Sequence, residues 1–233
     1  MSQFVHLHVH SEHSPMQGTS TIRALCQAAR QQNAGALALT DTNGLYGAIR
    51  FVDIASEQGL RPILGAELIH QSHRALCLIK DRSGYSNLCQ LLSELHCRPD
   101  FDLIQAVKEY RRGLIVASDD LQGLLAWKRQ SKSDLYVELT AGALMHQALA
   151  VSRRLQLPPV ATNRVTFLSP DEFHLHQTLR AIALNTSLSR LPPDACASPT
   201  HWLTPPGMLN RQFPHVPQAL TNTHLIAERC LTE

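Results

Sequence analysis

Short apolar runs alternate with longer amphipathic stretches along most of the chain, and this alternation limits the fold more than any other feature. The short runs are typical of buried strands, whereas the longer stretches carry apolar residues at helical spacing. Alternation of strands and helices along the chain favours a parallel sheet covered by helices. The expected strands are residues 4–9, 36–40, 62–69, 75–79, 114–117, 135–139 and 159–162. Seven strands in one rotation suggest a barrel, and an open doubly wound sheet is the alternative.

The chain has 233 residues, of which 44% are hydrophobic, so it can bury an ordinary core. We expect one domain over residues 1–233, with a barrel core over about 1–190. Residues 191–217 are rich in proline, and a last helix is expected over 218–231. No apolar run is long enough to cross a bilayer, and the N-terminus lacks the layout of a secretory signal. The sequence therefore predicts a cytoplasmic protein without a membrane partner.

Several classes of site are disfavoured by what the sequence lacks. The net charge of +2 is far from that of a strongly basic nucleic-acid binder, so contact with DNA would be local or would depend on a larger assembly. No glycine-rich phosphate loop follows a strand, which leaves a nucleotide site without a motif. The six cysteines form no CxxC pair and are expected to be reduced thiols. No arrangement of the Ser-His-Asp or Cys-His kind is evident.

Histidines are concentrated at the N-terminus, where four of the thirteen fall within the first thirteen residues. Alternate residues of a strand share a face, so His6, His8 and His10 are expected to project to one side. Working groups of parallel α/β folds gather at the carboxyl ends of strands. The polar residues expected at that end are His8, His10, Asp41, Glu67, Glu138 and Asn163. Imidazoles with a carboxylate would suit zinc or manganese, although the same residues can also bind nothing and cap helices.

Five segments, taken in order, resemble a known family. They are His6 to Ser14 (HLHVHSEHS), Ala38 to Gly47 (ALTDTNGLYG), Pro62 to Glu67 (PILGAE), Gly84 to Leu88 (GYSNL) and Pro159 to Asn163 (PVATN). This series is similar to the N-terminal PHP (polymerase and histidinol phosphatase) domain of bacterial C-family DNA polymerases, which include the DNA polymerase III alpha subunit and its error-prone relatives. The likeness extends from Phe4 to about Cys230. It implies a distorted (β/α)7 barrel of the PHP type, and a full-length parent that is a DNA-directed DNA polymerase.

The resemblance also implies a cluster of up to three divalent metals, and this chain matches it in part. His8, His10 and Glu67 fall on ligand positions, and Asp120 or its neighbour Asp119 could also coordinate. The other positions of that cluster carry Gln17, Thr42, Arg74, Arg164, Thr166 and His176, of which only His176 keeps a residue common in the family. His73, the neighbour of Arg74, is the alternative residue for the position given to Arg74.

Two arginines at ligand positions argue against a complete cluster, because a guanidinium cannot be deprotonated and repels a nearby cation. We therefore expect at most one zinc or manganese ion, held by His8, His10, Glu67 and Asp120, no required cofactor and no catalytic residue. The guanidinium of Arg164 is expected either to pair with Glu67 or to lie in solvent.

The resemblance implies a mainly structural or partner-docking domain in DNA replication. Its partners would be the rest of the polymerase chain and a separate proofreading exonuclease subunit, with DNA reached only through the full polymerase. Apolar residues of the proline-rich stretch would either form the docking surface or cover the barrel: Trp202, Leu203, Met208, Leu209 and Phe213. The alternative function is a metal-dependent phosphoesterase, such as a 3′ to 5′ exonuclease acting on DNA.

Overall fold

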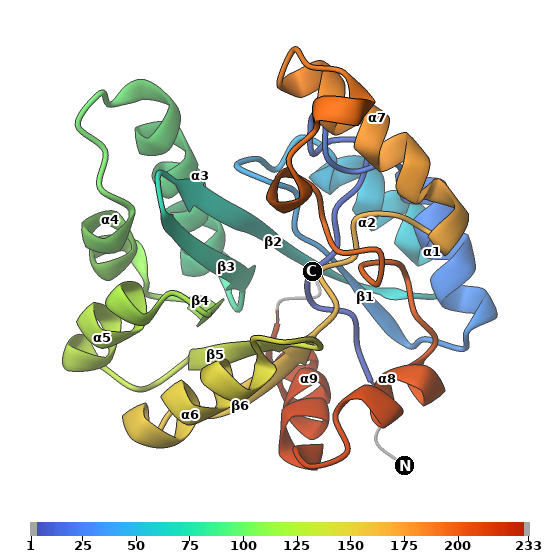
Figure 1. The fold of residues 1–233 in the computed structure, drawn as a ribbon. Coiled ribbons are helices and arrows are strands. Elements are labelled where there is room, and N and C mark those ends of the chain that lie inside the picture. The colour runs from blue at the N-terminus through green and yellow to red at the C-terminus, as the bar shows by residue number, and fades with distance from the viewer. Residues whose placement is uncertain (1–3, 231–233) are drawn as a thin grey trace.

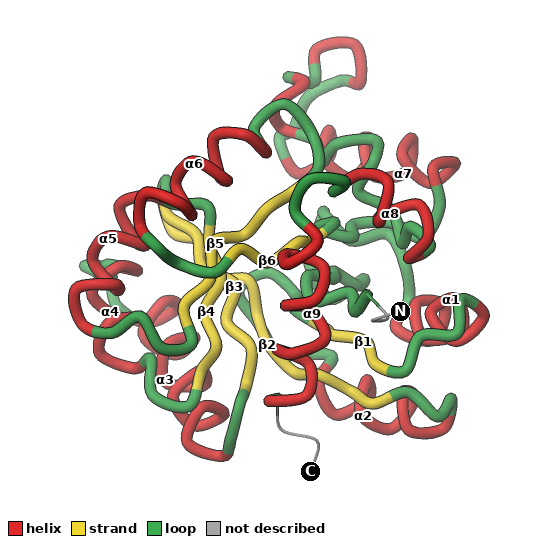
Figure 2. Tube along the Cα trace, turned by 90° about the horizontal axis from the view of Figure 1, so that it is seen from below, coloured by secondary structure: helices red, strands yellow, loops and turns green. Residues whose placement is uncertain are grey.

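The computed structural model describes residues 4–230, and its sheet has six strands that lie side by side in sequence order (Figure 1). Six of the seven expected strands are present. They are β1 (Ala36–Leu39), β2 (Arg61–His70), β3 (His73–Ile79), β4 (Leu114–Ser118), β5 (Leu135–Thr140) and β6 (Pro159–Thr162). The sheet is strongly curled, and most of the helices lie along its outer side (Figure 2).

β3 runs antiparallel to both of its neighbours, so the expectation of an all-parallel sheet was wrong. The two-residue turn Gln71–Ser72 joins β2 to β3, and His70 pairs with His73 across it. A parallel connection needs about a dozen residues or more, so a turn this short can only produce a hairpin. The pairs β1–β2, β4–β5 and β5–β6 are parallel, as expected.

The segment from Phe4 to His10 lies between the two edges of the sheet without forming a regular strand. On one side the amide of Ala38 donates to the carbonyl of His6 (3.0 Å). On the other side the amide of Val165 donates to His8 (2.9 Å), and Val9 forms an isolated bridge with Val165. The architecture is therefore α/β with a curled half-barrel sheet, and the complete (β/α)7 barrel is not confirmed.

The helices surround the sheet in the order of the chain. α1 and α2 pack together beside β1, α3 to α5 cover β2 to β4, and α9 lies against β6 (Figure 1). Their bounds are α1 Ile22–Gln31, α2 Ala48–Glu57, α3 Arg82–Cys97, α4 Leu103–Tyr110, α5 Leu121–Gln130, α6 Met145–Leu155, α7 Phe173–Ala183, α8 Pro206–Gln212 and α9 Pro217–Arg229. Residue 231, the expected end of the last helix, lies outside the described residues. Within residues 4–230, no helix has the length and apolar composition needed to span a membrane.

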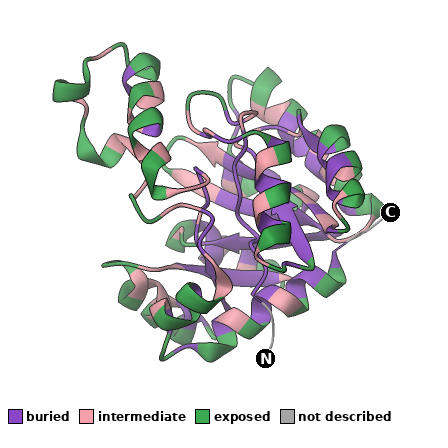
Figure 3. Cartoon of the chain, turned by 90° about the vertical axis from the view of Figure 1, so that its right-hand side faces the viewer, coloured by how far each residue is buried: buried purple, intermediate pink, exposed green. Residues whose placement is uncertain are grey.

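Alternation along the strands sends side chains to the two faces of the sheet, and the strands themselves are buried (Figure 3). The described residues form three cores: one inside the curl, a large one beneath the outer helices, and a third between β1 and helices α1 and α2. Leu76 and Leu78 of β3 belong to the core inside the curl, whereas Cys77 belongs to the core beneath the outer helices. Glu67 is paired with Leu76 in register and Glu138 follows Tyr136 by two residues, so both carboxylates are on the inner face. The inside of the curl is thus apolar at one end and charged at the other.

The proline-rich segment packs into the molecule instead of presenting an apolar surface. Leu203, Leu209 and Phe213 are buried, and α9 is tied to the sheet by Asn222, whose side-chain amide donates to the carbonyl of Pro159 (2.7 Å). Met208 is exposed and Trp202 is half-buried. Of the two expectations for this segment, covering the barrel is the one that fits its buried members.

Candidate metal centre

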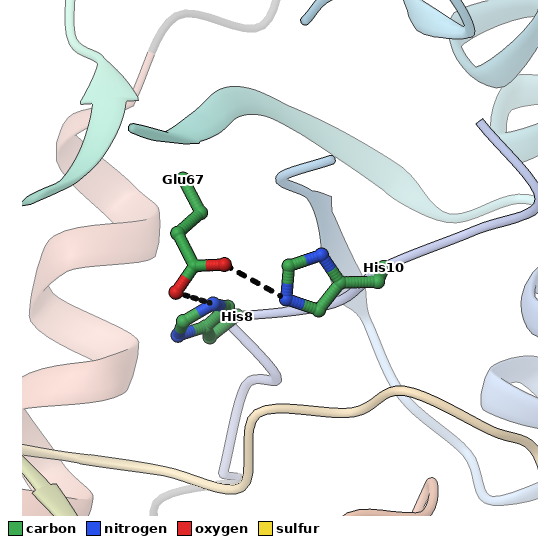
Figure 4. Close-up of side chains that lie close together, drawn as sticks. All are labelled: His8, His10 and Glu67. Carbon is green, nitrogen blue, oxygen red and sulfur yellow. Dashed lines mark ion pairs between the residues drawn. The ribbon is translucent and has the colours of Figure 1, made fainter. Parts of the chain in front are cut away.

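Three potential ligands meet inside the curl at the charged end (Figure 4). Nε2 of His8 lies 3.4 Å from one oxygen of Glu67, and Nε2 of His10 lies 3.4 Å from the other. All three residues are buried, and their ligand atoms lie within 4.8 Å of one another. The irregular N-terminal segment supplies both histidines, and β2 supplies the carboxylate.

His6 does not join this group, contrary to the expectation that alternation would bring three histidines to one face. Its Nε2 lies 3.0 Å from the carbonyl of Thr204, and its ring packs edge-on against Phe4. Burial lowers the pKa of His6 to about 4, with a smaller opposing effect from the Thr204 carbonyl. The reason for the difference is that residues 4–10 do not follow one continuous strand.

A second buried carboxylate, Glu138 on β5, holds His8 from the other side of its ring. Nδ1 of His8 lies 2.6 Å from Oε1 of Glu138, which also accepts a hydrogen bond from Thr162 (2.6 Å). Burial alone would lower the pKa of His8, but the carboxylates of Glu138 and Glu67 outweigh it and raise the pKa to about 9. In the absence of a metal ion, His8 is therefore an imidazolium at neutral pH.

Two arginines neutralise the remaining acidic groups. Arg74 and Arg164 each donate from Nη2 to Oε2 of Glu138, at 2.9 and 3.0 Å. They also donate to separate oxygens of Asp119, at 2.7 and 2.6 Å. Arg74 alone approaches Glu67, with Nη1 3.4 Å from Oε1. The expected pair between Arg164 and Glu67 is therefore not formed. Arg164 pairs with Glu138 and Asp119 instead.

The donor set fits one divalent cation. Nε2 of His8 is buried and has no hydrogen-bond partner, although it faces Glu67. Two imidazole nitrogens and a carboxylate are ligands that zinc and manganese accept. A cluster of several ions does not fit, because the guanidiniums of Arg74 and Arg164 already occupy Glu138 and Asp119. If an ion is bound, His8, His10 and Glu67 hold it, and it supplies a Lewis acid to the cavity beside them.

That cavity has a volume of about 270 Å³ and opens beside His10 and Glu67. The family's metal cluster has six further positions, beyond the ligands named above. Five of them lie in the wall of this cavity, namely Gln17, Arg74, Arg164, Thr166 and His176. His176 is buried, with Nδ1 2.8 Å from the carbonyl of Gln17 and Nε2 accepting from the amide of Ala197. The sixth position, Thr42, lies between the ligands, with Oγ1 3.4 Å from Nδ1 of His10.

Asp120 lies apart from the three ligands. Its carboxylate caps α5 by accepting from the amide of Gln122 (2.9 Å), and it pairs with His73 (2.7 Å). Its neighbour Asp119 faces the two arginines. Glu138 was expected at a strand end but not among the ligands, and no role was expected for Ser14. The sequence did contain a signal for Asp119. It follows Ile115 and Ala117 at intervals of two residues, and the side chains of those two point inside the curl, so alternation directs Asp119 to the same face.

Comparison with known proteins agrees with the motifs. The PHP domain family matches residues 6–150. This chain belongs to the PHP family. It is 27% identical to the DNA polymerase III subunit alpha of Campylobacter jejuni, with 100% of this chain and 24% of that protein covered. It is 30% identical to the same subunit of Vibrio cholerae (98% and 23% covered) and to the error-prone DNA polymerase of Symbiobacterium thermophilum (97% and 25%).

The chain thus spans about a quarter of the length of these curated relatives. Among solved structures, a two-domain protein from Bacteroides vulgatus, described as containing a predicted PHP-like metal-dependent phosphoesterase, superimposes with a TM-score of 0.52. Its sequence is 14% identical, and the match covers 71% of this chain and 52% of that one. At this identity the likeness concerns the fold, which is that of the PHP-like proteins.

Proposed function

We propose that this chain is the N-terminal PHP domain of a bacterial DNA polymerase III alpha-type subunit, and that its role is mainly structural or partner-docking. In this proposal the metal site is depleted to at most one ion and the domain does not hydrolyse phosphodiesters. The full-length parent would be the DNA-directed DNA polymerase. The relatives support the assignment, since the chain aligns over nearly all of its length with a quarter of each polymerase.

The observation that carries the proposal is the pair of arginines on Glu138. Hydrolysis of a phosphodiester by several metals needs ions on both the attacking and the leaving oxygen. Here Arg74 and Arg164 bind the two carboxylates, Glu138 and Asp119, that lie next to the ligand group. Guanidiniums keep their protons and provide no activated water. They do neutralise buried carboxylates, which is a stabilising role.

A metal-dependent phosphoesterase, such as a 3′ to 5′ exonuclease on DNA, is the alternative. The convergence of His8, His10 and Glu67 beside an open cavity favours it. One ion could polarise a phosphoryl oxygen there. A general base for the attacking water would then have to come from the cavity wall. Arg74, Arg164 and Arg180 are cationic there and Glu67 is itself a ligand, so the group left for this role is His201, whose imidazole is neutral because burial lowers its pKa to about 4.

Two measurements distinguish these functions. Elemental analysis after equilibration with zinc or manganese should give no more than about one ion per chain. Incubation with a chromogenic phosphodiester or a 3′-recessed DNA should give no more turnover than the His8→Ala/His10→Ala variant. Clear turnover that this double variant abolishes would establish the phosphoesterase instead.

We extend the proposal to the partners, location and extent of the domain. The rest of the polymerase chain and a proofreading exonuclease subunit are the proposed partners, DNA is contacted only through the full polymerase, and the location is cytoplasmic. We also propose that residues 1–233 form one domain, which the packing of Phe213 and Asn222 supports. Co-elution of this chain with the separately expressed remainder of the polymerase chain would test the first partner.

A further inference from the structure

We infer that Ser14 is a positioning residue for the ligand group: its hydroxyl fixes the proton of His10 on Nδ1 and leaves the lone pair of Nε2 directed at Glu67. Ser14 is buried in the loop after the N-terminal segment. The part of this inference that concerns metal affinity rests on the single-ion site proposed above. The part that concerns the tautomer of His10 rests on hydrogen bonds alone.

The direction of the hydrogen bonds begins at Asp41, a buried carboxylate. It accepts from the amide of Ser11 (2.6 Å) and from the hydroxyls of Ser11 (2.8 Å) and Ser14 (2.7 Å). The hydroxyl of Ser14 is the donor in its bond to Asp41, so its single proton is committed there. The oxygen of Ser14 can then act only as an acceptor toward its other neighbours.

Those neighbours are the amide of Thr42 and the ring of His10, both 3.0 Å from Oγ of Ser14. An amide donates, and Nδ1 of His10 must donate as well, because the oxygen has no second proton. Thr42 Oγ1 is the other group near Nδ1, at 3.4 Å, and it directs its own proton to Glu67 (3.5 Å). Both hydroxyls near Nδ1 are thus acceptors. The neutral ring therefore carries its proton on Nδ1 and its lone pair on Nε2.

His8 is oriented in the same sense by a different group. Its Nδ1 lies 2.6 Å from Glu138, so its Nε2 also faces Glu67. The two rings lie with centroids 5.0 Å apart and approach opposite oxygens of one carboxylate. Glu138 holds the ring of His8, and Ser14, itself bound to Asp41, holds the ring of His10. Together they would direct the Nε2 atoms of both rings at the same cation. Groups that fix a ligand in this way are worth about 10- to 100-fold in metal affinity.

Nitrogen NMR of the metal-free protein tests the tautomer directly. Long-range ¹H–¹⁵N spectra of wild type should show the proton of neutral His10 on Nδ1. The Ser14→Ala/Thr42→Val variant removes both acceptors and should shift the population toward Nε2–H. Ser11→Ala is the matched control, because it removes a buried hydroxyl from the same carboxylate without touching His10. It should leave the His10 signals unchanged.

Zinc affinity, measured by competition with a chromogenic chelator, provides the second readout. Ser14→Ala should raise the dissociation constant by about 10- to 100-fold, and Ser11→Ala should change it by less than about threefold. A proton on Nε2 in wild type, or equal weakening by the two variants, would overturn the inference. If wild type binds no zinc, the single-ion site fails, while the spectrum of wild-type His10 still decides the role of Ser14.

Discussion

Arg164 pairs with Glu138: its Nη2 lies 3.0 Å from Oε2 of a carboxylate that is 1% exposed. The backbone of Arg164 has a positive φ of 44°, in the left-handed region that residues other than glycine rarely adopt. Its guanidinium also contacts Asp119. An arginine in a disfavoured backbone conformation is thus bound to two acidic groups at the mouth of the curled sheet.

Replacing Arg164 with alanine should destabilise the protein by about 1–3 kcal/mol, the range for leaving buried polar partners unsatisfied. Alanine keeps the Cβ atom, so the backbone strain is similar in both proteins. In denaturant melts, Arg164→Ala and Glu138→Gln should couple by about 0.5–3 kcal/mol in a double-mutant cycle. Arg164→Ala with Glu67→Gln should be close to additive. Arg23→Ala, which breaks an exposed pair with Glu57, is the control and should cost less than about 1 kcal/mol.

The stability of the metal-free protein should fall as pH rises above neutrality. Burial alone would lower the pKa of His8, but Glu138 and Glu67 outweigh it, so the pKa is about 9 in the folded protein against about 6.5 for an ordinary histidine. The folded state therefore keeps a proton that the unfolded state releases. This contribution is fully present below pH 6.5 and disappears by about pH 9. Urea melts in EDTA should show the decline, and His8→Gln should flatten it. An unchanged slope in His8→Gln would contradict the assignment.

His6 should make the free energy of unfolding fall as the pH is lowered, which is the opposite direction to the effect of His8. Burial holds its pKa at about 4, so between about pH 6.5 and 4 the unfolded state binds a proton that the folded state does not. The stabilising contribution is present above pH 6.5 and is lost as pH falls toward 4. His6→Gln should reduce the acid slope of the unfolding free energy. If the slope of the variant equals that of wild type, His6 is not the neutral buried group described above.

Much of the sheet could be predicted from the sequence, because apolar runs identify buried strands whatever their direction. The direction of β3 was missed because it depends on the two residues of the turn Gln71–Ser72, which hydrophobic pattern does not weigh. The pairing of Arg164 was missed for a different reason. Glu67 and Glu138 both lie in the C-terminal halves of their strands and are chemically alike, so the sequence cannot tell which of them a guanidinium reaches. Strand order and register decide that.

The protein should remain folded without metal. Arg74 and Arg164 neutralise Glu138 and Asp119, and Arg74 also approaches Glu67, so no described acidic group of this cluster depends on an ion. A cooperative thermal transition should persist in EDTA. Zinc at about 100 times its dissociation constant should add no more than about 2.7 kcal/mol, the amount expected from one-site linkage. His8→Ala/His10→Ala should abolish this increment. Loss of the cooperative transition in EDTA would show that the fold depends on metal.

The proline-rich segment should contribute to stability through its buried side chains. Phe213 is 1% exposed and belongs to the outer core together with Leu209 and Ala219 of the same segment, whereas Met208, five residues earlier, is 48% exposed. Phe213→Ala removes a large buried ring and leaves a cavity, which typically costs about 3–5 kcal/mol. Met208→Ala should cost less than about 0.5 kcal/mol, because little of its surface leaves water on folding. Denaturant melts of the two variants measure the difference. A small effect of Phe213→Ala would mean that residues 191–230 fold on the barrel without stabilising it, and the single domain over residues 1–233 would have to be abandoned.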